Sequence, residues 1–243
     1  GRTLERMVQL RSVLFQIYFA LMSVAVNVLW LPSLLGPPRW ALMGIEVWGR
    51  LTLWGLRVIC GLTYEVRGRE HLHGAPALYA GKHLAMWDTV VLPLVLKHPA
   101  LVLKRQLLSI PFYGWYARKA GMIAIDREGH ASALRRMVTA GKARLAEGRP
   151  IAIFPEGTRK KPGAAPDYKP GVAALYGMLD VACVPFALNS GVYWAGPLRK
   201  PGRIVIEFLP AIPPGLKRRD FMAALEGSVE SATARLIAEA GTR

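Results

Sequence analysis

A run of 23 residues without a charged side chain, Val13 to Leu35, limits the possible folds of this chain more than any other feature. As a helix rising about 1.5 Å per residue, it is long enough to cross the roughly 30 Å hydrocarbon layer of a membrane. The run is too long for the apolar part of a signal peptide, and no A-x-A-like cleavage site follows it. Gln16, Ser23 and Asn27 interrupt the run. Packing against a second helix would explain these polar side chains.

A second apolar segment, Trp40 to Cys60, follows a break rich in proline and glycine. Its only charged residues, Glu46, Arg50 and Arg57, fall within about 40° of one another on a helix and form one narrow polar stripe. Such a helix can lie in a membrane interface, pair with the first segment as a hairpin, or cap a soluble domain as part of a buried hairpin. We expect residues 1–61 to form a two-helix membrane-associating element.

The composition favours an anionic membrane over nucleic acid as the partner of a basic surface. The chain has 32 Lys and Arg against 16 Asp and Glu, a formal net charge of +16. Apolar residues make up 52% of the chain, which is high for a soluble protein. Each Lys or Arg near an anionic bilayer contributes about 1 kcal/mol of attraction, and the sequence has no nucleic-acid-binding motif.

From Tyr64 onward, short β-rich runs alternate with helical patterns, which is typical of an α/β layered domain. We expect residues 62–243 to form one such domain, with a mixed twisted sheet flanked by helices. The predicted strands are Thr63–Val66, Ala77–Ala80, Leu101–Lys104, Met122–Asp126, Ile151–Phe154, Ala182–Leu188 and Ile204–Leu209. The predicted helices include Ser132–Glu147 and Arg218–Ala240, and residues 160–170 form a loop rich in proline and glycine.

Four short segments stand at or just after predicted strand ends, where α/β sheets usually place ligands. The segments are Gly81–Asp88, Gly121–Arg127, Phe154–Arg159 and Cys183–Leu188. The first contains a histidine and an aspartate, His83 and Asp88, that would lie about 140° apart on a continuous helix. A strand-to-helix turn would let Asp88 accept the Nδ1 proton of His83 and leave Nε2 as a base, although such pairs often serve structure instead.

The sequence offers no covalent nucleophile, because it has no G-x-S-x-G motif and no cysteine near a histidine. A substrate hydroxyl would take that part. In the third segment, Gly157, Thr158 and Arg159 suit a phosphate through backbone N–H groups, a hydroxyl and a guanidinium, unless this is an ordinary loop with a solvated arginine. The fourth segment is apolar enough to be either core or the wall of an acyl-chain site.

In these four segments and in their order, the chain resembles the bacterial 1-acylglycerol-3-phosphate acyltransferases, within the larger family of glycerolipid acyltransferases. The resemblance extends to Lys104–Leu107, Ile110–Trp115 and Tyr168–Gly171, and covers the chain from about Tyr64 to its C-terminus. The N-terminal stretch is similar to the membrane-associating element of the family. The chain departs from the commonest pattern at four positions near the predicted site, Lys82, Leu84, Ala85 and Gln106.

The resemblance implies that His83, helped by Asp88, removes the proton from the sn-2 hydroxyl of a lysophospholipid as that oxygen attacks an acyl thioester. The donor would be acyl-CoA or acyl carrier protein, with no metal and no cofactor. The expected substrate-binding residues are Arg159 first, then Lys104 and Arg127, with Thr158, Gly157 and Glu156 shaping the site or offering backbone donors to an oxyanion. The enzyme would lie on the inner (cytoplasmic) membrane, with its catalytic domain facing the cytoplasm.

Three other functions fit the same residues. The acceptor could be another lysolipid, such as a lyso-ornithine lipid; the site could hydrolyse lipids; or the chain could be a basic membrane-binding protein without catalysis. His71, His73, His98 and His130 need no function, because each is expected in a loop or at a helix end. The two cysteines, Cys60 and Cys183, predict neither a disulfide framework nor a metal site.

Overall fold

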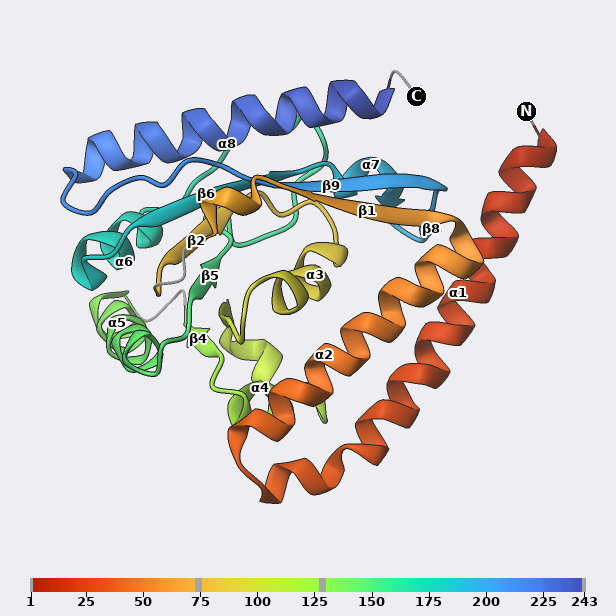
Figure 1. Ribbon diagram of the computed structural model, residues 1–243, viewed down its shortest axis with the longest axis horizontal. Coiled ribbons are helices and arrows are strands. Elements are labelled where there is room, and N and C mark those ends of the chain that lie inside the picture. Colours follow the sequence, from red (N-terminus) through yellow and green to blue (C-terminus); the bar gives the residue numbers. More distant parts are fainter. Residues whose placement is uncertain (1, 73–75, 127–129, 242–243) are drawn as a thin grey trace.

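The computed structural model describes residues 2–72, 76–126 and 130–241, and in it the two apolar N-terminal segments form helices that pack side by side (Figure 1). The first helix, α1, is Arg2–Leu29, and a short 3-10 turn, η1, follows at Leu31–Leu35. The second helix, α2, is Pro38–Gly55 and continues as a π-helical turn, η2, over Leu56–Cys60.

The polar side chains of the first helix form hydrogen bonds with different parts of the chain. The Trp48 indole N–H donates a hydrogen bond to the Ser23 hydroxyl at 2.9 Å, while the Asn27 side chain donates to the Ser23 carbonyl within α1 at 2.7 Å. The third polar residue, Gln16, accepts from Arg199 of the α/β domain at 3.4 Å. Packing against the second helix, as predicted, therefore accounts for Ser23. Gln16 is met by Arg199 and Asn27 by its own helix instead.

The hairpin leaves a large apolar face uncovered. In α1, Leu10 is 60% exposed, Leu21 68% and Leu29 75%, and Trp54 and Val58 of the second segment are also more than half exposed. Within the described residues, α1 is the one helix that is long and apolar enough to cross a membrane, over Thr3–Leu29. The rest of the chain therefore does not bury the outer face of this hairpin. This observation excludes the alternative in which the two segments form a buried hairpin that caps a soluble domain.

The α/β domain is built on a seven-stranded mixed sheet in the order β1-β9-β6-β2-β5-β3-β4. Neighbouring strands are parallel except β6 and β9, which are antiparallel. The strands are β1 Leu62–Arg67, β2 Leu78–Gly81, β3 Ala100–Lys104, β4 Ile123–Ile125, β5 Ile151–Ile153, β6 Cys183–Leu188 and β9 Gly202–Phe208. All seven predicted strands and the predicted fold class are thus confirmed. A small hairpin, β7 Trp194–Ala195 and β8 Leu198–Arg199, stands apart from the sheet.

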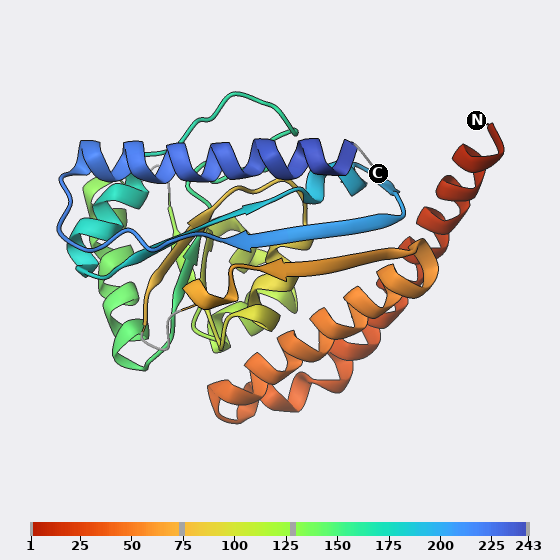
Figure 2. The same ribbon diagram turned by 45° about the horizontal axis from the view of Figure 1, so that its top comes forward.

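Helices cover both faces of the sheet (Figure 2). The longest helix of the domain, α8 (Arg218–Gly241), lies across one face against β6 and β9, while α3 (Trp87–Val95) lies between the sheet and α2. The remaining helical elements are η3 Arg69–His71, η4 Arg105–Ser109, α4 Tyr113–Lys119, α5 His130–Ala146, α6 Gly171–Leu179 and α7 Ser190–Tyr193. The central strands β2, β5 and β6 are buried along their whole length, which explains why their sequences are continuous apolar runs rather than alternating ones.

Candidate active site

The turn predicted between His83 and Asp88 is present. Strand β2 ends at Gly81, and α3 begins at Trp87, so His83 lies in the connecting loop and Asp88 in the first turn of the helix. Oδ2 of Asp88 lies 2.8 Å from Nδ1 of His83. The same oxygen accepts the backbone N–H groups of Leu84 and Ala85 at 2.7 and 2.9 Å. The bend of the backbone therefore brings the two side chains together, and no described residue forms a hydrogen bond with Nε2, the other ring nitrogen.

The other oxygen of Asp88 is held from a distant part of the chain. The Ser190 hydroxyl, at the start of α7, donates a hydrogen bond to Oδ1 at 2.5 Å. Both side chains are fully buried, with 0% exposure. The carboxylate thus has donors on both oxygens, which fixes its orientation and, through it, that of the imidazole.

Phe154 of the third segment and the following Lys160 hold the imidazole at its ring face and at its backbone. The Phe154 ring stacks on the His83 ring, with centroids 4.1 Å apart and planes inclined by 17°. The Lys160 N–H donates to the His83 carbonyl at 2.8 Å. The His83 side chain is left only 13% exposed. Its freedom to rotate is restricted on the ring face, at Nδ1 and at the backbone.

A buried ion-pair network lies next to the histidine. Nζ of Lys82 is 3.1 Å from Glu156 Oε1 and 2.7 Å from Glu230 Oε1 of α8. Glu156 also accepts the Asp167 N–H at 3.1 Å, and the Tyr168 hydroxyl donates to Glu230 at 2.9 Å. Burial, and next the negative charge of Glu230, raise the pKa of Tyr168, so it stays a neutral donor. The network ties the His83 loop to the third segment and to α8.

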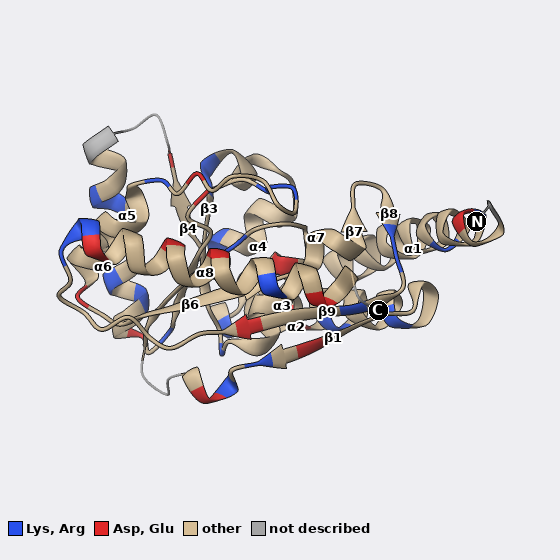
Figure 3. Cartoon of the chain, turned by 90° about the horizontal axis from the view of Figure 1, so that it is seen from above, with Lys and Arg blue, Asp and Glu red and all other residues tan. Residues whose placement is uncertain are grey.

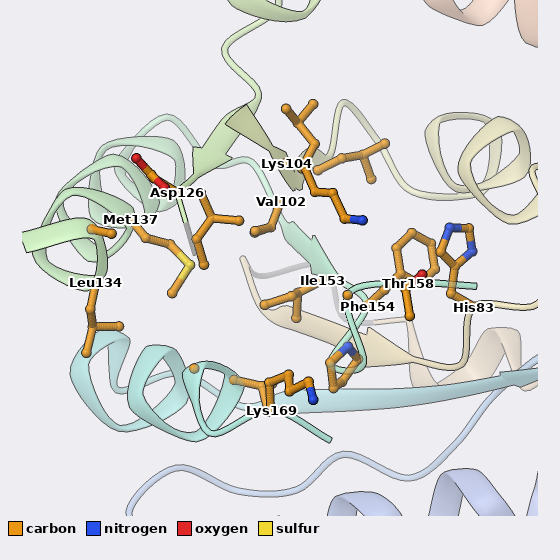
Figure 4. Close-up of a pocket in the computed structure, with 18 of the residues that line it drawn as sticks. His83, Val102, Lys104, Asp126, Leu134, Met137, Ile153, Phe154, Thr158 and Lys169 are labelled. Carbon is orange, nitrogen blue, oxygen red and sulfur yellow. The ribbon is translucent and has the colours of Figure 1, made fainter. Parts of the chain in front are cut away.

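The ring of His83 opens onto a cavity of about 780 Å³ between the carboxyl ends of the strands and α5 and α6 (Figure 4). One part of its wall is basic and polar, and contains Lys104, Thr158, Arg159, Lys169 and Arg218. Another part is apolar and contains Val102, Ile125, Leu134, Met137 and Ile153. In Figure 4, His83 and Lys104 lie at one end and Leu134 and Met137 at the other. One cavity therefore joins an imidazole, several cations and an apolar wall, which can bind an amphipathic anion.

Most of the predicted substrate-binding residues line this cavity. Lys104, Gly157, Thr158 and Arg159 stand on its wall with His83, and Asp88 lies behind the histidine. Neither Lys104 nor Arg159 makes an ion pair with an acidic residue in the described part of the chain. Arg127 falls outside the described residues.

For Glu156 and Gly157 of the third segment, the contacts favour a role in shaping the site over one as oxyanion donors. Glu156 does not line the cavity, because its carboxylate turns into the buried pair with Lys82, where it is 2% exposed. Gly157 has φ +62°, which favours glycine, and its N–H donates to the Phe154 carbonyl at 2.8 Å. That N–H closes a turn and is not free to donate to an oxyanion. Both residues shape the loop that carries Thr158 and Arg159.

A family model described as Acyltransferase matches residues 63–189, just over half of the chain. This chain belongs to the acyltransferase family. The match includes His83, Asp88, Lys104 and Arg159, and ends one residue before Ser190. The matched region thus contains the histidine–aspartate pair and all the residues that line the cavity except Arg218.

Individual relatives of the acyltransferase carry more specific names. The chain is 36% identical over 170 residues to the 1-acyl-sn-glycerol-3-phosphate acyltransferase of Pseudomonas aeruginosa, covering 69% of this chain and 66% of the relative. It is 32% identical over 143 residues to the enzyme of the same name from Borreliella burgdorferi, covering 58% and 55%. The matched region thus spans less than two thirds of the length of these curated relatives.

The fold is also that of a solved structure. The crystal structure of the 1-acyl-sn-glycerophosphate acyltransferase from Thermotoga maritima superposes with a TM-score of 0.72 at 20% sequence identity, over 93% of this chain and 97% of that one. At this identity the likeness speaks for the fold alone.

Sequence reasoning missed several residues of this site. Ser190 gave no signal, because nothing in the sequence relates it to Asp88, 102 residues away. Lys82 was noted as unusual, but its pairing with Glu156 and Glu230 spans 74 and 148 residues. Lys169 and Arg218 also line the cavity. The Tyr168–Gly171 segment, which resembles the family pattern, was the one available hint of Lys169.

Proposed function

We propose that this acyltransferase moves a fatty acyl group from a thioester donor to the sn-2 hydroxyl of 1-acylglycerol 3-phosphate, giving phosphatidic acid. The observation that carries the proposal is the pairing of His83 with a buried, fully hydrogen-bonded Asp88 at the polar end of a cavity that is basic on one side and apolar on the other. The names of the bacterial relatives support the choice of acceptor.

In this mechanism Nε2 of His83 takes the proton of the acceptor hydroxyl as its oxygen attacks the thioester carbonyl carbon. The tetrahedral intermediate then collapses, the carbon–sulfur bond breaks, and the imidazolium returns the proton to the leaving thiolate. Asp88 stabilises the imidazolium through Nδ1. General-base assistance of this kind typically contributes about 10² to 10⁴ in rate. The remaining acceleration comes from holding donor and acceptor together in one cavity.

The phosphate of the acceptor would bind between Arg159 and Lys104, with a hydrogen bond from Thr158. These side chains share the cavity wall with His83, and both cations lack an acidic partner in the described part of the chain. The apolar wall around Leu134 and Met137 would take an acyl chain. Glu156 and Gly157 would act indirectly by shaping the loop, and Arg127 stays a further candidate for phosphate binding.

The proposal includes a membrane location. Residues 1–61 would form the membrane-associating element and residues 62–243 the acyltransferase domain. The uncovered apolar face of α1 and α2 supports this division, and Figure 3 shows that these two helices carry few charged residues compared with the rest of the chain. The site would lie on the cytoplasmic side of the inner membrane, where soluble acyl donors are available.

The test is a synthesis assay with the His83→Ala variant. Purified protein is incubated with vesicle-borne lysophosphatidate and a labelled acyl thioester, supplied in separate reactions as acyl-CoA and as acyl carrier protein. We expect the wild type to form the diacyl product, and the variant to lose at least about 10²-fold in rate because the general base is gone.

Three controls make the result decisive. His98→Ala changes a histidine that pairs with Glu46 at 3.7 Å and does not line the cavity, so this variant should keep its activity. Lyso-ornithine lipid as acceptor tests the alternative head group. Release of free fatty acid by the wild type would favour a hydrolase, and near-normal synthesis by His83→Ala would exclude the proposed role of this residue.

A further inference from the structure

The segment that leads from the end of η4 into the first turn of α4, residues 110–115, exposes large apolar side chains. Ile110 is 47% exposed, Tyr113 46% and Trp115 44%. The sequence here is Ile-Pro-Phe-Tyr-Gly-Trp. Isolated exposed apolar residues are common, but three within six positions, two of them aromatic, form a patch that suits an apolar partner.

The backbone of this segment is fixed rather than loose. The Gly114 N–H donates to the Ile110 carbonyl at 2.8 Å, and a Cβ at Gly114 would collide with the Leu108 carbonyl. Phe112 has φ +61°, a region that residues other than glycine rarely occupy. A strained conformation persists only where the surroundings enforce it, and such strain is concentrated at functional segments.

The segment lies between the apolar hairpin and the mouth of the cavity. Directly after it, Tyr116 donates a hydrogen bond to the Asn27 carbonyl at 2.6 Å and packs with Ala41 and Leu42 of α2. Figure 1 shows α4 beside the closed end of the hairpin. On its other side, Tyr113 and Leu107 line the cavity that contains His83. The patch therefore continues the exposed apolar face of the hairpin towards the candidate active site.

Basic side chains flank the patch on both sides. In the sequence, Lys104 and Arg105 precede it and Arg118 follows it. All three are exposed, and Arg105 already pairs with Asp126 at 3.2 Å. Tryptophan and tyrosine together with lysine and arginine are the residues that proteins place at the depth of lipid head groups. Apolar contact and attraction to anionic lipid add together in such an interface. An anionic lipid surface therefore fits this patch better than a protein partner, for which the flanking cations would need matching acidic groups.

We propose that residues 110–115 insert into the lipid head-group layer as a second membrane contact beside the hairpin, and that a lysolipid enters the cavity from the bilayer past Tyr113. This inference rests on the membrane location in the proposed function. It adds Tyr113 as the point at which the lysolipid enters the cavity. It would place the mouth of the cavity at the membrane surface rather than in the aqueous phase.

The first test measures insertion directly with an environment-sensitive fluorophore on single introduced cysteines. The native thiols do not interfere, because Cys60 and Cys183 are both fully buried. Probes are placed at Ile110 and Trp115, at Leu21 of α1 as the hairpin reference, and at Met178 of α6 as the control. Met178 is 48% exposed, similar to Ile110, but does not line the cavity.

On addition of phosphatidylglycerol and phosphatidylethanolamine vesicles, we expect probes at 21, 110 and 115 to shift to the blue and brighten by about two-fold or more, while the probe at 178 does not change. A response at 21 with none at 110 or 115 would overturn the entry proposal and leave the hairpin contact standing. No response at 21 would overturn the membrane location as well as this inference.

The second test separates membrane entry from chemistry. The double variant Ile110→Asp with Trp115→Asp, neither of which lines the cavity, is compared with Met178→Asp. With vesicle-borne lysophosphatidate we expect the double variant to lose about ten-fold in rate, whereas short-chain lysophosphatidate dispersed as monomers should react within about two-fold of wild type. Equal losses on both substrates would contradict the proposal. So would normal rates on vesicles in a variant that has lost binding to a soluble protein, because the patch would then be a protein-binding site.

Discussion

Asp88 accepts hydrogen bonds from an imidazole, two backbone N–H groups and a hydroxyl, and its side chain is 0% exposed. The number of donors matters because a buried carboxylate is costly unless its lone pairs are satisfied. Removing the hydroxyl leaves Oδ1 without its donor and frees the carboxylate to turn. At the residue scale, Ser190 is therefore expected to position the His83–Asp88 pair without touching the substrate.

Ser190→Ala tests this positioning role. We expect the free energy of unfolding to fall by about 1 to 3 kcal/mol, as for loss of a buried hydrogen bond to a charged group. We also expect kcat to fall by about ten-fold with little change in either KM, because the proton acceptor is less well oriented. Denaturant unfolding and steady-state kinetics measure both. The control is Ser228→Ala, whose hydroxyl bonds to Leu225 within α8, and an unchanged kcat in Ser190→Ala would refute the role.

Arg159→Ala tests the phosphate site. A charge-assisted hydrogen bond contributes roughly 1.5 to 3 kcal/mol, so the KM for lysophosphatidate should rise about ten-fold or more while the donor KM stays constant. Kinetics with each substrate varied in turn measure the difference. Arg69→Ala, an exposed arginine that does not line the cavity, is the matched control. A rise in the donor KM alone would assign Arg159 to the donor.

At the scale of elements, the Lys82–Glu156–Glu230 network joins the β2–α3 loop, the loop after β5 and helix α8. Lys82 and Glu156 are 3% and 2% exposed, and Glu156 Oε2 has no hydrogen-bond partner among the described residues. Removing either partner of this pair would leave the other charge buried without a counter-charge, which is strongly destabilising. Because Lys82 directly precedes His83, we expect a change in this network to alter the loop that carries His83.

Lys82→Met should therefore destabilise the fold by about 3 to 5 kcal/mol, since it leaves the buried Glu156 without its cation. Adding Glu156→Gln to that variant should restore part of the loss by removing the unpaired charge. Urea unfolding measures both changes. Arg105→Met provides the comparison: its ion pair with Asp126 is exposed, with the arginine side chain 67% accessible, and should contribute about 0 to 1 kcal/mol. Similar losses for the buried and exposed pairs would contradict this account.

At the scale of the whole molecule, an uncovered apolar hairpin is combined with a net charge of +16. We expect binding to anionic vesicles to weaken as salt rises from about 0.1 to 1 M, because the screening length falls from about 10 to 3 Å, yet to persist at high salt through apolar contact. Vesicle flotation measures it, and neutral vesicles, for which salt should have little effect, are the control. Complete release at high salt would mean that the hairpin does not insert.

The local sequence determined the elements and the chemical groups. An uncharged run from Val13 to Leu35 predicted the long apolar helix, although the helix ends at Leu29 and a 3-10 turn follows. Apolar runs predicted all seven strands of the main sheet, and a turn was required between His83 and Asp88. These predictions depend on periodicity and on spacing within about ten residues, where the backbone geometry of helices, strands and turns sets which side chains can meet.

Which side chains from distant parts of the chain contact the site residues was decided by the tertiary structure alone. Strands β2 and β6 pair in parallel, so their carboxyl ends meet at one edge of the sheet, and the start of α7 brings Ser190 onto Asp88. The packing of α8 over β6 likewise brings Glu230 to Lys82. Contacts across such sequence separations depend on strand order and helix packing, which arise from the competition of the whole chain for burial and which no local pattern encodes.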